Sequence, residues 1–244
     1  MNLAEKIKEL HASKYKFVIV SSGGGSNAIA SLLKVPGASN TVLEAYIPYA
    51  KESLDFYLMK KPDFYASKDT SLRMAARAYS AAKKIDQESS LNHLLGVSIT
   101  ASLSTTYEKR GDHKFHIALQ TRDFSKSISC KLEKGTRTRE EEEELVTAFV
   151  VNLLAECSQL KYDYPKIPEE VVFDEVKAEK GWAELMSNKI NYVLSEDVSP
   201  ELIFPGAFYP YHDGHKAMKD LAEQETGKKI FFEICIQNVD KPPI

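Results

Sequence analysis

The sequence predicts an α/β fold with three layers, because two kinds of apolar pattern alternate along residues 1–160. Short, unbroken runs such as Phe17-Val18-Ile19-Val20 are typical of buried strands in a parallel or mixed sheet. The segments between such runs repeat their apolar residues at helical spacing, as Leu3, Ile7 and Leu10 do. Alternating strands and helices favour a sheet that is covered by helices on both faces.

The first 160 residues are expected to hold five helices and five strands, joined by short turns. A Gly-rich turn, Ser21 to Gly25, follows the first strand, and Ser26 begins the next helix. The Glu140–Glu144 run lies in the first turns of the last helix, where the helix dipole favours anions. We interpret this run as a solvated helix start rather than a metal site. The helices are expected over residues 3–12, 26–34, 49–58, 68–85 and 136–160, and the strands over residues 17–20, 41–47, 94–101, 114–120 and 127–132.

Residues 161–198 are expected to form a connector with one helix, near 177–194, around the only tryptophan, Trp182. Residues 199–244 then return to the α/β alternation. They predict a strand over 201–205, a helix over 214–226 and a strand over 229–237. This order indicates a partial Rossmann-like β-α-β unit.

The composition is typical of a globular protein: 43% of the 244 residues are hydrophobic and 27% are charged. Acidic and basic residues are mixed and the net charge is −3, which gives no electrostatic reason to expect nucleic acid or an anionic membrane as a partner. Residues 1–16 are charged, and no apolar run approaches the roughly 20 residues that span a bilayer. We therefore expect a cytoplasmic protein, whose three cysteines, Cys130, Cys157 and Cys235, are reduced and buried.

The most specific chemical signal lies where the strand over 201–205 meets the next helix. A loop at the carboxyl end of a strand, followed by a helix start, presents free N–H groups to an anion. Gly206 would let the backbone approach a ligand closely, and His212 and His215 lie three residues apart. Two imidazoles there could face one phosphate and stabilise charge that builds on it during attack. The alternative interpretation is a surface loop with two incidental histidines.

This stretch resembles the nucleotidyltransferase signature Gly-x-Phe-x-Pro-x-His-x-Gly-His, which is found in nicotinamide-mononucleotide adenylyltransferases and cytidylyltransferases. The resemblance implies that both histidines contact nucleotide phosphates and that the second supports the transition state. Mg²⁺ would accompany a nucleoside triphosphate in a completed site. The family's second half, with a Ser/Thr-rich stretch and basic residues, is not present in residues 199–244, so we expect a truncated domain or a remnant. The matching residues are Gly206, Phe208, Pro210, His212, Gly214 and His215.

A second candidate anion site is the turn after the first strand. Ser21 or Ser22 could be a nucleophile raised on the turn, with N–H groups of the following helix as an oxyanion hole. The turn, Gly23 to Gly25, is neither a Gly-x-Gly-x-x-Gly fingerprint nor a P-loop, because no Gly-Lys-Ser/Thr follows it. The alternative is a tight turn with capping serines.

The order of features along residues 3–160 resembles the CinA C-terminal domain, a family that contains nicotinamide-mononucleotide amidases. The family pattern is roughly Glu-Ser-x-Thr-Gly-Gly, Val-Pro-Gly-Ser-Ser, Tyr-Ser-Asn-x-x-Lys and Thr-Gly-x-Ala-Gly-Pro. Residues 32–39, with Val35-Pro36-Gly37 at their centre, carry the most specific match. The resemblance implies a three-layer domain that handles a pyridine nucleotide and that forms homo-oligomers.

Position by position, this resemblance places Ser21 on the family's catalytic serine and Tyr49 on its tyrosine. Gly24 and Gly25 match its two glycines, and Thr100 matches the threonine of its later loop. The family's glutamate, threonine and lysine positions hold Val20, Gly23 and Leu54, and Ala101-Ser102-Leu103-Ser104 replaces its Gly-x-Ala-Gly run. A serine without a nearby general base is a poor nucleophile, so retained phosphate binding by Ser22, Gly23, Gly24, Gly25 and Thr100 is expected before amidase activity.

Other polar residues give weaker signals. The basic loop from Lys109 to Lys114 could contact a phosphate near the Gly-rich turn, or it is a solvated turn. His93, His113 and His116 do not have metal-ligand spacing, and His113 and His116 are expected on opposite faces of a strand.

Three functions therefore compete. The first is a nucleotide-metabolism protein that binds a pyridine mononucleotide or a nucleoside triphosphate, as a CinA-like domain, 1–160, joined to a nucleotidyltransferase-like segment, 199–244. The second is a nicotinamide-mononucleotide amidohydrolase that uses Ser21. The third is a non-catalytic, oligomeric binding or scaffold domain. The sequence predicts no resident cofactor or metal for any of them.

Overall fold

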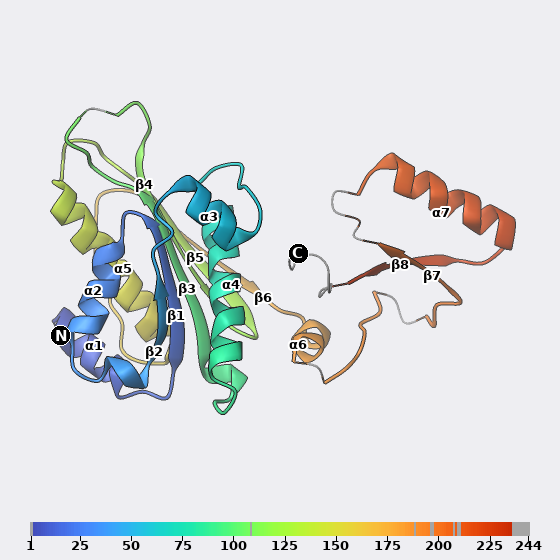
Figure 1. Ribbon diagram of the computed structural model, residues 1–244, viewed down its shortest axis with the longest axis horizontal. Coiled ribbons are helices and arrows are strands. Elements are labelled where there is room, and N and C mark those ends of the chain that lie inside the picture. The colour runs from blue at the N-terminus through green and yellow to red at the C-terminus, as the bar shows by residue number, and fades with distance from the viewer. Residues whose placement is uncertain are drawn as a thin grey trace. The chain divides into compact units, whose positions relative to one another are not determined.

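The computed structural model describes residues 2–107, 109–187, 189–195, 198–206, 208 and 211–235 (Figure 1). The chain divides into two compact units, Met1–Asn191 and Tyr192–Ile244. The first unit is built on a six-stranded sheet and the second on a two-stranded sheet.

The sheet of the first unit has the strand order β2-β1-β3-β4-β5-β6. The three strands on one side run parallel and the three on the other side are antiparallel. The parallel β1–β3 pair aligns Ser21 with Ile99 and Ser22 with Thr100, so their carboxyl ends meet at one edge of the sheet. The strands are β1 (Lys16–Gly23), β2 (Val42–Tyr46), β3 (Leu94–Ser102), β4 (His113–Gln120), β5 (Phe124–Leu132) and β6 (Val171–Lys177).

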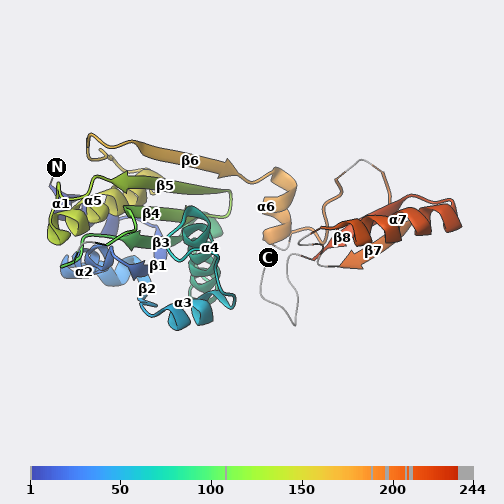
Figure 2. The same cartoon turned by 90° about the horizontal axis from the view of Figure 1, so that it is seen from above.

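Helices cover both faces of this sheet, as Figures 1 and 2 show. Alternate residues of β1 point to opposite faces: Phe17 and Ile19 enter one apolar core, with α1, α2 and α5, and Val18 and Val20 enter the other, with α3 and α4. The predicted three-layer α/β fold is confirmed. The helices are α1 (Leu3–His11), α2 (Ser26–Lys34), α3 (Lys51–Leu58), α4 (Lys68–Ile85), α5 (Arg139–Cys157) and α6 (Lys180–Met186), with short 3-10 turns at Ala38–Asn40 and Leu91–His93.

Local sequence accounts for the helix starts and for one close contact between layers. Thr138 and Glu141 form a reciprocal capping box that begins α5. Gly96 of β3 has no side chain where α4 crosses it, and a Cβ there would lie 2.2 Å from the carbonyl oxygen of Ala75. The glycine therefore sets how closely α4 approaches the sheet.

Four local predictions were wrong. Ser21 and Ser22 do not lie on a turn, because β1 continues to Gly23. The segment interpreted as a connector contributes the edge strand β6, paired antiparallel with β5, and only a short helix, α6. The glutamate run of α5 is not fully solvated, since Glu142 is completely buried. Cys130 and Cys157 are buried as expected, but Cys235 is exposed.

The second unit is the predicted partial Rossmann-like β-α-β unit. It consists of β7 (Leu202–Gly206), α7 (Asp213–Thr226) and β8 (Ile230–Ile234), and β7 pairs with β8 in parallel. Phe204, Phe208 and Phe232 form its aromatic cluster, with ring centroids 4.5 to 5.5 Å apart. No residue within α7 is fully buried, so this unit holds little apolar core of its own.

Candidate functional site

The glycine turn at the carboxyl end of β1 has the backbone geometry of an anion site. Gly23 and Gly25 have φ of +80° and +93°, values that side-chain-bearing residues rarely adopt. A Cβ on Gly23 would lie 2.2 Å from the carbonyl oxygen of Ala101, and the N–H of Gly24 donates to that same oxygen at 3.1 Å. Glycine is therefore required here because the turn presses against the end of β3.

The two candidate serines face opposite sides of the sheet, and their hydroxyl groups hold the backbone. Ser21 is 1% exposed, and its Oγ donates to the carbonyl oxygen of Gly24 at 3.1 Å. Ser22 Oγ donates to the carbonyl oxygen of Pro48 at 2.9 Å. Among the described residues, the hydrogen-bond partner of Ser21 Oγ is thus a backbone carbonyl and not a lysine or histidine base. This arrangement stabilises the turn but does not activate a nucleophile.

Thr100 and Tyr49 are placed around the same edge without converging on Ser21. Thr100 shares the α4 face with Ser22, and its Oγ1 donates to the carbonyl oxygen of Tyr65 at 2.8 Å. Tyr49 follows the Pro48 carbonyl that Ser22 contacts, and its side chain is 68% exposed. The structure therefore brings Ser22 and Thr100 to one face, while Ser21 lies on the other face of the sheet.

The N-terminus of α2, where a phosphate was predicted, receives a carboxylate from the protein itself. Glu143 of α5 accepts from the N–H of Gly25 at 2.9 Å and from the N–H of Asn27 at 3.4 Å, both through Oε2. Its other oxygen, Oε1, pairs with Nη2 of Arg139 at 2.8 Å. Because an anion at a helix start satisfies free N–H groups and the helix dipole, Glu143 does internally what a phosphate would do.

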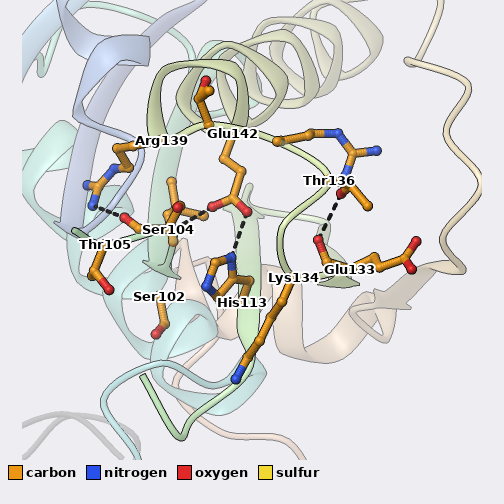
Figure 3. Close-up of polar contacts among 12 residues, drawn as sticks. Ser102, Ser104, Thr105, His113, Glu133, Lys134, Thr136, Arg139 and Glu142 are labelled. Carbon is orange, nitrogen blue, oxygen red and sulfur yellow. Dashed lines mark hydrogen bonds and ion pairs between the residues drawn. The ribbon is translucent and has the colours of Figure 1, made fainter. Parts of the chain in front are cut away.

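Glu142, the neighbour of Glu143, clamps the loop that follows β3 (Figure 3). Its Oε1 lies 2.8 Å from Nδ1 of His113, and its Oε2 accepts from the N–H of Ser104 at 2.6 Å. Glu142 is completely buried and His113 is 7% exposed. Arg139 adds a contact from Nη1 to the carbonyl oxygen of Ser104 at 3.3 Å. The first turn of α5 thus closes over the edge where β1 and β3 end.

The basic loop before β4 also folds back onto this edge. Lys109 Nζ donates to Ser102 Oγ at 2.8 Å and to the carbonyl oxygen of Leu103. Burial lowers the pKa of the Lys109 ammonium below its ordinary value. Lys109 is therefore used to fix the loop from within, and not as a free phosphate contact.

The hollow beside α2 does not suit an anionic ligand. It has a volume of about 580 Å³ and is lined by Ser26, Asn27, Ala30, Lys34 and three glutamates. These glutamates, Glu140, Glu143 and Glu144, oppose a phosphate, and Lys34 is the single lysine of the lining. Within the described residues, no group of three or more His, Cys, Asp or Glu side chains is placed to bind a metal ion.

The histidine loop of the second unit is arranged differently. His212 is the residue before α7, and its ring stacks on that of His215 with centroids 3.7 Å apart and planes at 21°. No side chain caps α7 at His212, so the first-turn N–H groups of the helix are not used by a cap. Two imidazoles and a helix start therefore lie together, as the sequence predicted; Ala207, Tyr209 and Pro210 of the motif lie outside the described residues.

The motif glycines make room for the motif rings. A Cβ on Gly206 would lie 2.5 Å from Cζ of Phe208, and one on Gly214 would lie 3.1 Å from Nδ1 of His212. Phe208 has φ of +44° and packs edge-on against His215 at 5.1 Å. Nδ1 of His215 is buried and has no hydrogen-bond partner among the described residues. Gly206, Phe208, His212, Gly214 and His215 therefore form one interlocked structure.

Sequence reasoning did not identify the glutamates as part of the first site. Glu143 lies 118 residues after Gly25, so no local motif connects the two. The acidic first turn of the predicted helix is a weak sequence signal for this contact, because a carboxylate there can accept hydrogen bonds from the N-terminus of a second helix. Nothing in the Glu140–Glu144 run indicates that Glu142 is buried, because such a run is typical of a charged surface.

Comparison with known proteins shows the fold of the first unit and nothing finer. No protein-family model matches the chain, and no curated protein is significantly similar in sequence. Among solved structures, the chain is similar to the competence/damage-inducible protein CihA from Agrobacterium tumefaciens, with a TM-score of 0.52 and 15% identity over 64% of this chain and 96% of that one.

Two further solved structures are a CinA superfamily protein from Escherichia coli and a competence or damage-inducible protein from Enterobacter asburiae. Both have a TM-score of 0.50, at 11% and 13% identity, over 64% of this chain and 90% and 96% of theirs. The first unit therefore has an α/β fold like that of the CinA proteins. Within the described part of the chain, no helix combines the length and the apolar character that a bilayer crossing requires.

Proposed function

We propose that this protein binds a nucleotide through the histidine loop of its second unit, and that its CinA-like domain does not catalyse a reaction at Ser21. The observation that carries this proposal is the stacked pair of His212 and His215 at the uncapped start of α7. A phosphate there would receive hydrogen bonds from first-turn N–H groups and from the imidazoles.

The ligand class follows from this geometry and from the two family resemblances. A phosphate group is the part of the ligand that the loop can recognise, and a pyridine mononucleotide or a nucleoside triphosphate supplies one. Asp213 adds a carboxylate in the first turn of α7, which favours a phosphate that arrives with Mg²⁺ over a bare one. We therefore expect a nucleoside triphosphate to bind more tightly when Mg²⁺ is present.

Catalysis at Ser21 is not favoured, because the hydroxyl and the helix-start N–H groups that an amidase would use are already hydrogen-bonded within the protein. The hydroxyl of Ser21 is buried and donates to a backbone carbonyl, and the helix start beside it is filled by Glu143. The strand end and α5 would both have to move before a substrate could reach the serine. This arrangement supports a domain kept as a scaffold.

A role in assembly is the second candidate function, and the edge strand β6 favours it. Val172, Phe173 and Val176 are 45%, 51% and 68% exposed on this strand, which ends the sheet. β6 carries exposed apolar side chains as well as Asp174, Glu175 and Lys177, and an edge strand can pair with another chain, so a homo-oligomer formed through β6 is expected. Val176→Lys should shift the mass measured by light scattering from oligomer to monomer.

Isothermal titration of the full chain tests nucleotide binding. The double variant His212→Ala, His215→Ala should weaken binding of a Mg²⁺-nucleoside triphosphate at least about 10-fold, equal to about 1.4 kcal/mol. His93→Ala, which removes a histidine from the first unit, is the matched control and should bind as the unaltered protein does. Equal affinity in the double variant, or no saturable binding at millimolar nucleotide, would contradict the proposal.

A further inference from the structure

A second polar pair lies on the face of the sheet opposite to Glu142 and His113. His116 of β4 and Ser129 of β5 are directly opposite each other in the antiparallel register. Nδ1 of His116 lies 2.8 Å from Oγ of Ser129. This distance is a full hydrogen bond between a potential nucleophile and a potential base.

The pair lines a hollow of about 530 Å³ on this face. Small-molecule sites in proteins have volumes of roughly 300 to 1,000 Å³, so the hollow can hold a small substrate. Ser129 is partly exposed, which leaves its hydroxyl within reach of a molecule there. Acidic groups outnumber basic ones in the lining of the hollow, whose charged side chains are Lys114, Lys131, Glu133, Glu169 and Glu170.

His116 carries no charge at neutral pH. Burial, and then the nearby Lys114 ammonium, lower the pKa of His116 to about 4. The imidazole is therefore neutral at neutral pH, and in the tautomer that carries its hydrogen on Nε2 it accepts the Ser129 hydroxyl hydrogen at Nδ1. A hydroxyl that donates to a neutral imidazole is the arrangement that activates serine in nucleophilic catalysis.

The pair is also poorly built for stability alone. Nε2 of His116 is buried and has no hydrogen-bond partner among the described residues. Leaving a buried polar group unpaired costs about 1 to 3 kcal/mol, and most such groups in proteins are paired. A polar pair that is kept at this cost, on the wall of a hollow, points to a use other than packing.

We propose that Ser129 is a catalytic nucleophile, activated by His116, which cleaves a small uncharged carboxylic ester. An anionic ester is disfavoured because acidic groups outnumber basic ones in the lining of the hollow. The site lies in the antiparallel part of the sheet, away from Ser21 and the glycine turn. It is also independent of nucleotide binding by the second unit.

The reaction has two balanced halves. Ser129 Oγ bonds to the acyl carbon while its proton passes to Nδ1 of His116, and the bond from that carbon to the alcohol oxygen breaks. His116 returns the proton to the leaving alcohol. Water then attacks the acyl group on Ser129, gives a proton to His116, and releases the acid as Ser129 recovers its hydrogen.

Covalent labelling tests the nucleophile directly. The full chain is treated with a fluorophosphonate, and the modified peptide is mapped by mass spectrometry. The adduct is expected on Ser129, absent in Ser129→Ala, and formed about 100-fold more slowly in His116→Asn. Ser125→Ala, a matched serine on the same face of β5, should label as the unaltered protein does.

Hydrolysis of two nitrophenyl esters tests the substrate class. The uncharged acetate ester should be hydrolysed with a KM about 10-fold lower than that of the anionic mono-nitrophenyl ester of succinate. Circular dichroism confirms that each variant is folded. The position of the adduct on the unaltered protein tests the nucleophile even if a variant fails to fold. An adduct on Ser21 in place of Ser129, no adduct on folded protein, or labelling unaffected by His116→Asn would overturn the proposal.

Discussion

The first and second units each contain a strand, a glycine-bearing loop and a helix start, yet only one of these loops is open. In the first unit, Glu143 reaches the N–H groups of Gly25 and Asn27 from a distant helix. In the second unit, α7 begins without a side-chain cap, beside the stacked rings of His212 and His215. The local motif thus creates the capacity to bind an anion, and a residue far away in the sequence decides whether that capacity is free.

Removal of Glu142 should have the largest effect on the closed loop. Glu142→Ala leaves His113 and the N–H of Ser104 without their buried partner, and breaking a buried polar pair costs about 3 to 5 kcal/mol. Urea unfolding should show this loss of stability. Glu140→Ala, at an exposed position of the same helix, should change stability by no more than about 0.5 kcal/mol. Equal effects of the two variants would mean that the clamp does not hold the loop.

The turn itself should be the next most sensitive feature. Gly23→Ala combines a positive φ with a Cβ that would lie 2.2 Å from the carbonyl oxygen of Ala101, so we expect a loss of about 3 kcal/mol. Gly111→Ala is the matched control, because a Cβ there meets nothing within 4 Å. A calorimetric melt of both variants measures the difference. A Gly23→Ala protein as stable as the control would show that the turn is not strained.

Sequence reasoning predicted most of the fold because helix and strand signals are local. It found α4 and the β7-α7-β8 order from periodicity and turn residues. It missed β6, whose residues Val171–Lys177 follow a stretch rich in tyrosine and proline and gain strand structure by pairing with β5. Pairing of this kind is a property of the tertiary fold and leaves little trace in the segment itself.

The sequence indicated which strand ends and helix starts carry the candidate residues, but not whether their polar groups are already hydrogen-bonded within the protein. The motifs correctly placed His212 and His215 at a helix start, but Ser22 was expected on a turn and lies instead in β1, opposite Thr100 of β3. Nothing near Ser21 in the sequence indicates that its hydroxyl bonds to Gly24, or that Glu143 fills the adjacent helix start. Those facts depend on contacts between residues that are far apart along the chain.

Acid should weaken the first unit through a salt bridge near α5. The Arg137 guanidinium lowers the pKa of Glu169 to about 2. A carboxyl whose folded pKa is depressed contributes stability above its unfolded value, and that contribution is lost as the pH falls from about 4.5 towards 2. We expect Glu169→Gln to remove up to about 2 kcal/mol of this pH dependence in urea titrations at a series of pH values. An unchanged pH profile would contradict this assignment.

Removal of Glu143 should cost the least stability. It should also open the anion site of the first unit and so make its loop resemble that of the second unit. Glu143→Ala frees the N–H groups of Gly25 and Asn27 and should destabilise the unit by about 1 kcal/mol. Millimolar phosphate should then raise the melting temperature of this variant more than that of the unaltered protein. Glu144→Ala, at an exposed neighbouring position, should not gain this response. If phosphate does not raise the melting temperature of Glu143→Ala, the turn cannot bind an anion even when it is open.

Hydrogen exchange read by mass spectrometry, with and without a Mg²⁺-nucleoside triphosphate, tests the central claim most directly. The nucleotide should slow amide exchange at residues 211–217, where α7 begins, and leave exchange at residues 23–28 unchanged. Protection at residues 23–28 without protection at residues 211–217, or at neither segment under saturating nucleotide, would contradict the claim that the open anion site is in the second unit.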